Sequence, residues 1–126
     1  MIRFQEIMGR EFDWVAVDTN GNCALFSSAG GGLIPQEVVP LIQCFDELAE
    51  EFEMPNWGSE AVWDNYADVG MFVFDSDDTG GPYKRVREPG AALKPEVRAL
   101  LNRLPNQVKF DGSFGTTDTI NSWPKS

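Results

Sequence analysis

The glycine-rich stretch at residues 28–37, SAGGGLIPQE, has the residue types of an anion-binding loop. Glycines ahead of a helix N-terminus expose backbone N–H groups that bind phosphate, usually beside a lysine and a serine or threonine. Here the nearest basic residue downstream is Lys84, and the third glycine of a dinucleotide-binding fingerprint is missing. The sequence therefore favours a bend between a strand and a helix. Anion capture by the glycines at 30–32 stays open as an alternative.

A second stretch, DSDDTGG at residues 75–81, resembles the opening of a calcium loop. An EF-hand loop also needs a bidentate glutamate at its twelfth position, and that position here is Val86. Turns are rich in aspartate and glycine for conformational reasons alone. We therefore predict a hairpin turn and no metal site.

Catalytic residues are hard to assemble from this composition. The chain has no histidine, which excludes histidine-activated serine and cysteine nucleophiles and all histidine-based zinc sites. Carboxylate pairs remain, and a glycosidase-like enzyme is the third-ranked alternative. Such pairs arise by chance in so acidic a chain, so we predict a protein without catalytic residues or a cofactor.

Charge is distributed unevenly. The net charge is −10, and residues 11–83 contain fifteen Asp or Glu but no Lys or Arg. This charge repels nucleic acid and anionic membranes and attracts a basic partner. We predict a protein partner with a basic surface, and neither a nucleic-acid nor a membrane partner. Solubility alone is the alternative explanation of the charge.

The candidate partner-binding residues combine this charge with tryptophan, a favoured interface anchor. Each of Trp57, Trp63 and Tyr66 taken singly is more typical of a core, but as a group beside the acidic helix they are the best interface candidate. The predicted interface consists of acidic and tryptophan side chains from residues 46 to 78: Asp46, Glu47, Glu50, Glu53, Trp57, Trp63, Asp64, Asp68, Asp75, Asp77 and Asp78.

The elements that position these residues follow from periodicity. Asn20-Gly21 predicts a hairpin joining strands at 12–18 and 23–28. Apolar spacing of three and four residues predicts a helix from Ile34 to about residue 53. Further helices are predicted at 59–68 and 94–104, and further strands at 70–75, 83–88 and 107–110. The expected fold is a single α+β domain over 1–126, an antiparallel sheet of about five strands with two to three helices packed on one face and an irregular tail from about 112.

Location and cysteine chemistry are also predicted. The N-terminal residues lack the apolar core of a signal peptide, and the apolar runs are too short to span a membrane. We therefore expect a cytoplasmic protein in which Cys23 and Cys44 are free thiols.

Three stretches together resemble a family. FDWVAVDTNGNCALFSSAGGGLIP, GMFVFDSDDTGGPYKRVREP and QVKFDGSF are similar to segments of cytosolic immunity proteins from bacterial polymorphic toxin systems, including Rhs-type ones. The resemblance spans most of residues 12–114. It implies a non-catalytic protein that binds a cognate toxin domain and occludes its active surface, with a small-ligand or nucleotide-binding regulatory module as the alternative. The matching residues look fold-defining: Trp14, Asp18, Gly21, Phe26, Gly30, Gly32, Pro35, Gly81, Pro82 and Tyr83.

Overall fold

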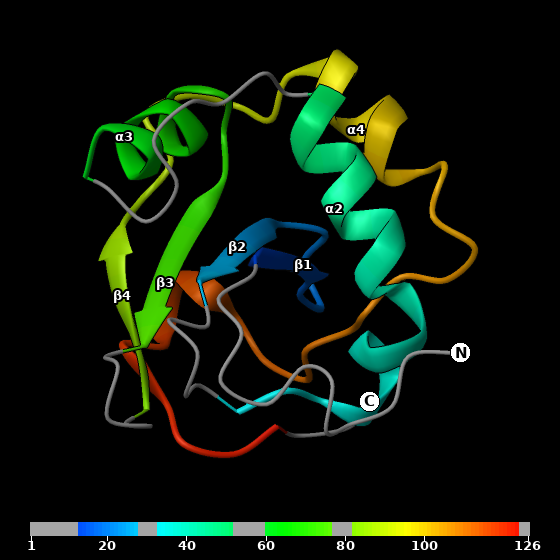
Figure 1. The fold of residues 1–126 in the computed structure, drawn as a ribbon. Coiled ribbons are helices and arrows are strands. Elements are labelled where there is room, and N and C mark those ends of the chain that lie inside the picture. The colour runs from blue at the N-terminus through cyan, green and yellow to red at the C-terminus, as the bar shows by residue number, and fades with distance from the viewer. Residues whose placement is uncertain (1–12, 28–32, 52–59, 77–81, 124–126) are drawn as a thin grey trace.

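The computed structural model describes residues 13–27, 33–51, 60–76 and 82–123. Its strands are β1 (Asp13–Val17), β2 (Cys23–Ser27), β3 (Phe72–Ser76), β4 (Tyr83–Arg87) and β5 (Thr119–Ile120). Its helices are the 3-10 segments η1 (Gln36–Leu41) and η2 (Phe114–Thr116) and the α-helices α2 (Ile42–Glu51), α3 (Glu60–Asp68) and α4 (Pro95–Leu101). Five strands in one sheet with three α-helices confirm the α+β class (Figure 1).

The strands are hydrogen-bonded in chain order, β1-β2-β3-β4-β5. The pairs β1–β2, β3–β4 and β4–β5 are antiparallel, as expected, but β2 and β3 are parallel. A parallel pair needs a long crossover connection, and the chain between these strands carries η1, α2 and α3. The expectation of a purely antiparallel sheet is therefore wrong at this one pairing.

The hairpin of β1 and β2 forms as its sequence predicts. The Asp18 N–H donates to the Asn22 carbonyl at 2.9 Å, and the Gly21 N–H donates to the Asp18 carbonyl at 3.1 Å. Gly21 has a φ of +83°, a conformation that residues with a Cβ rarely adopt. The Asn-Gly signal thus sets both the place and the register of this turn.

Alternation along the strands separates two faces of the sheet. Trp14, Phe26 and Phe74 are cross-strand neighbours on one face, with ring centroids 4.3 and 5.0 Å apart. The next register positions, Val15, Leu25 and Val73, point to the opposite face because successive side chains alternate. One face is therefore aromatic and the other aliphatic.

Helix α2 runs beside β1 and β2, to their right in Figure 1, and α4 lies next to α2. Leu41, Ile42 and Phe45 are buried in the core, as are Val97 and Leu101 of α4. The helix predicted from Ile34 begins as the 3-10 segment η1, and regular α-helix starts only after Pro40, which has no N–H to donate.

Helix α3 is tied to the chain that follows β4. The Gly90 N–H donates to the Ala67 carbonyl, and the Lys94 N–H donates to the Val69 carbonyl. Between α3 and β3, Gly70 has a φ of +99°, and a Cβ there would collide with the backbone of Leu93. A side chain at this position would push the 92–94 segment away from the helix.

The segment 108–120, which we call the C-terminal strap, joins both edges of the sheet. At one edge Val17 and Lys109 form a single parallel bridge, with 2.9 Å backbone bonds from Val17 to Val108 and from Phe110 to Val17. At the other edge β5 pairs with β4. The strand expected at 107–110 is thus reduced to one bridge, and η2 and β5 lie where an irregular tail was expected.

Two features predicted from the sequence lie outside the described residues. They are the glycine triplet at 30–32 and the turn at 77–81.

Candidate interaction surface

The residues predicted to form the interface are spread over three elements. Within the described residues they lie on α2 (Asp46, Glu47 and Glu50), on α3 (Trp63, Asp64 and Asp68) and on β3 (Asp75). The remaining four, Glu53, Trp57, Asp77 and Asp78, lie outside the described residues.

The outer positions of α2 and α3 carry exposed carboxylates. Glu47 is exposed on α2 and accepts only a long contact, 3.5 Å, from the Gln43 side chain. Asp64 and Asp68 are exposed on α3, and their four-residue spacing puts them on the same side of that helix. Asp75 differs, because it is half-buried and lies opposite Lys84 in the sheet.

Arg87 of β4 reaches across to α3. Its Nε donates to Asp64 Oδ1 at 2.7 Å, and its guanidinium carbon lies 5.7 Å from the centroid of the Trp63 ring. Its Nη1 donates to the Val86 carbonyl at 2.7 Å. The Arg87 and Asp64 side chains are 29% and 62% exposed, so this ion pair contributes at most about 1 kcal/mol to folding.

Trp63 is half-buried, yet its indole N–H is fully covered and has no hydrogen-bond acceptor among the residues that the structure describes. A covered and unpaired donor costs about 1–3 kcal/mol. Tyr66, the other described aromatic of the predicted cluster, is only 1% exposed and belongs to the core. Of the two, Trp63 alone is available at the surface.

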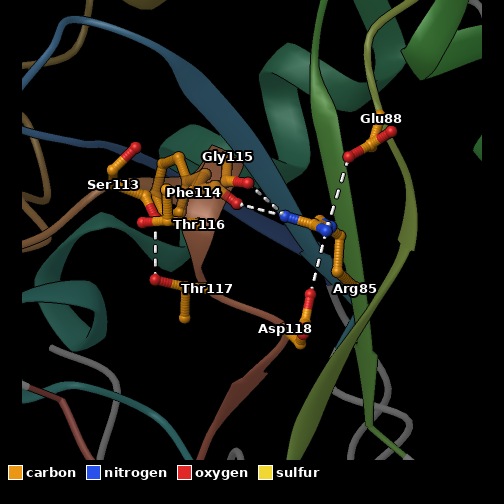
Figure 2. A network of polar contacts seen from close by, with 8 residues as sticks. All are labelled: Arg85, Glu88, Ser113, Phe114, Gly115, Thr116, Thr117 and Asp118. Carbon is orange, nitrogen blue, oxygen red and sulfur yellow. Dashed lines mark hydrogen bonds and ion pairs between the residues drawn. The ribbon is translucent and has the colours of Figure 1, made fainter.

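A second arginine, Arg85, is held much more fully (Figure 2). Its Nη1 donates to the carbonyls of Phe114 and Gly115 at 2.8 and 2.9 Å, and its Nη2 donates to Asp118 at 2.9 Å. Glu88 lies 3.4 Å from the same Nη2, and the side chain is 17% exposed. Arg85 therefore fastens the C-terminal strap to β4, a role that the sequence did not suggest.

Asp18 fastens the strap at the hairpin. Its buried carboxylate accepts hydrogen bonds from the backbone N–H groups of Asn20 and Asn22 at 2.9 Å and from that of Phe114 at 3.0 Å. Thr19 adds a side-chain bond of 2.8 Å to the Gly112 carbonyl. An aspartate two residues before Asn-Gly was the available signal for the turn, but nothing local pointed to residue 114.

Several residues of the immunity-protein pattern have structural roles, as the resemblance implied. Trp14, Phe26 and Tyr83 are 0% exposed. The Tyr83 hydroxyl donates to the Leu33 carbonyl at 2.9 Å and accepts from the Trp14 indole at 3.2 Å. These three side chains and that of Asp18 are buried, so they offer little surface to a partner.

The buried titratable groups are shifted by desolvation. Burial raises the pKa of Tyr66 and of Tyr83, and nearby Asp13 adds to both shifts. Burial also raises the pKa of the Cys23 thiol, which Arg98 partly opposes. Cys23 is buried and Cys44 half-buried, and both are free cysteines. A buried thiol with a raised pKa is a poor nucleophile.

Among the described residues, no group of three or more acidic, cysteine or histidine side chains is arranged to hold a metal ion. None of the described helices has the length and apolarity needed to cross a membrane.

Comparison with known proteins found no match to this chain among family models, curated proteins or solved structures.

Proposed function

We propose that this protein is a non-catalytic immunity protein, which binds a cognate bacterial toxin domain in the cytoplasm and occludes its active surface. The observation that carries the proposal is the placement of exposed acids on α2 and α3, in a stretch without Lys or Arg from residue 11 to 83. The resemblance of residues 12–114 to immunity proteins supports the same function.

Occlusion follows from the electrostatics. An acidic surface accelerates its encounter with a basic one, and a toxin that acts on nucleic acid or nucleotides carries its basic groups in the active-site cleft. A protein that binds with its acidic side chains in that cleft excludes the anionic substrate. Rapid capture suits an inhibitor that must act before the toxin does.

Two charge reversals separate local recognition from overall charge. Glu47→Lys with Asp68→Lys changes the net charge from −10 to −6, because each reversal adds two units. Glu96→Lys with Asp111→Lys, at exposed positions on α4 and at the start of the C-terminal strap, gives the same net charge. The second pair is therefore a matched control.

The partner is sought in the open reading frame next to the gene for this chain. The measurement is association of that partner with the chain, together with protection of cells that produce it. We expect the Glu47/Asp68 variant to associate about three- to tenfold more slowly than the control at low salt, with the difference shrinking as salt is added. Equal rates for the two variants at low salt would contradict an interface on α2 and α3.

A further inference from the structure

We propose that Trp63 and Asp64 form a binding notch for a guanidinium group, which Arg87 fills in the free protein and an arginine of the basic partner fills in the complex. This inference rests on the proposed function in one respect, that the partner is basic. It adds the chemical group recognised and the residue that competes for the site.

The notch already binds the group that we propose it recognises. The Arg87 guanidinium donates to Asp64 at 2.7 Å while its central carbon lies 5.7 Å from the Trp63 ring centroid. A carboxylate and an aromatic face together suit arginine better than lysine, because the guanidinium is planar and weakly hydrated. The geometry therefore selects among basic side chains.

Arg87 is held loosely enough to be exchanged. Asp64 is 62% exposed, so an incoming cation can reach its carboxylate from solvent. Arg87 also donates to the Val86 carbonyl through Nη1, a bond that does not involve Asp64. Arg85 on the same strand is the contrast, since four groups hold it and its side chain is 17% exposed.

The indole N–H of Trp63 gives the notch a second, unused recognition group. It is covered and lacks an acceptor within the described part of the chain. Among the described residues, this donor therefore has one hydrogen bond unmade, which a partner carbonyl can supply if binding uncovers it.

The test compares two peptides of equal charge, hexa-arginine and hexa-lysine, whose affinities are measured by calorimetry at low salt. Arg87→Met removes the competing guanidinium but keeps an unbranched stem against Trp63. Lys94→Met removes the same charge at an exposed position outside the notch and is the control. We expect the preference for arginine over lysine to rise about two- to fivefold in the Arg87 variant and to stay unchanged in the Lys94 variant.

Adding Asp64→Asn to Arg87→Met should return the preference to that of the unmodified chain. An unchanged preference in the folded Arg87 variant, or a raised one that survives the loss of Asp64, overturns the notch. Hexa-lysine reports separately on the proposed function: if it binds none of the variants, the attraction to a basic partner fails. The notch is then judged by hexa-arginine alone, with and without Asp64.

A measurement on the unmodified chain covers the case in which Arg87→Met does not fold. Nitrogen-15 NMR follows the Arg87 Nε–H and the Trp63 indole N–H during titration with hexa-arginine. We expect both signals to shift with the same midpoint, because one event displaces Arg87 and changes the environment of the ring. Static signals at saturation would overturn the inference.

Discussion

The aromatic face under the C-terminal strap and the outer surfaces of α2 and α3 differ in how their residues are held. Under the strap, Phe114 is 0% exposed and contacts the rings of Phe26, Phe74 and Phe110 at centroid distances of 5.8, 5.6 and 5.0 Å. On the helices, Glu47 and Asp68 are exposed. Packing fixes the first region, whereas solvent and charge govern the second.

The difference shows which region can change its partner-binding specificity without loss of the fold. A substitution under the strap disturbs several rings at once, because protein interiors are closely packed. A substitution on the outer side of α2 or α3 changes the electrostatic field and little else. Residues of the immunity-protein pattern such as Trp14 and Tyr83 lie in the first region. The pattern thus reports the fold, and the proposed function assigns recognition of a partner to the second region.

The largest expected effect breaks the packed region. Replacing Phe114 with alanine removes a fully buried ring from between two sheet strands and the strap, and should lower the free energy of unfolding by about 3–5 kcal/mol. Denaturant unfolding measures the change. The control is Thr116→Ala, at an exposed position in the same 3-10 segment, which should cost no more than about 0.5 kcal/mol.

A cost for Phe114→Ala as small as that of the control would mean that the strap is not part of the core. The strap would then be a surface segment, and the contrast between the two regions would disappear.

The next effect is a loss of stability at high pH, to which two buried tyrosines contribute, one under the strap and one on the inner side of α3. Burial raises the pKa of Tyr83 under the strap and of Tyr66 on α3, so both keep their protons in the folded state when the unfolded chain loses them near pH 10. The free energy of unfolding should therefore fall as the pH rises above about 10, by about 1.4 kcal/mol per pH unit for each tyrosine.

Unfolding curves between pH 9 and 11 test this for the unmodified chain and for Tyr83→Phe and Tyr66→Phe separately. Each substitution should reduce the slope by its own share, because phenylalanine has no proton to lose. A variant whose slope matches that of the unmodified chain would show that its tyrosine is not desolvated in the fold.

The sequence predicted most of what depends on neighbouring residues. Asn20-Gly21 set the first hairpin, and α3 and α4 were located to within a few residues. The helix predicted from Ile34 corresponds to η1 and α2 together, with the start of regular α-helix eight residues later. The parallel pairing of β2 with β3 was missed although the signal was present, since two strands on either side of a long helical stretch are typical of a crossover. Strand direction depends on where the chain returns, and residue periodicity alone carries little information about it.

The strap was missed for a different reason. Residues 112–119, GSFGTTDT, have the composition of a loop, and one phenylalanine among them gives no periodic pattern. Groups far away in the sequence position these residues. The Asp18 carboxylate and the Arg85 guanidinium hydrogen-bond to them, and the chain pairs with the edges of β1 and β4. The candidate surface could not be predicted for the same reason, because the hydrogen bond from Arg87 to Asp64 joins residues twenty-three positions apart.

The smallest expected change in the free energy of unfolding comes from the second region. A change close to zero there would support the contrast with the packed first region. Glu47→Lys with Asp68→Lys should change the free energy of unfolding by no more than about 0.5 kcal/mol per substitution, because both side chains are exposed and neither fills space in the core. At low salt the change should be a gain in stability, since like charges crowded on α2 and α3 repel one another.

The control pair, Glu96→Lys with Asp111→Lys, reaches the same net charge from positions nearer to basic residues and should gain less. Denaturant unfolding at low and high salt measures both pairs, and the advantage of the first pair should vanish at high salt. A loss of more than about 2 kcal/mol in the first pair would contradict the division, because it would show that these acids support the fold itself.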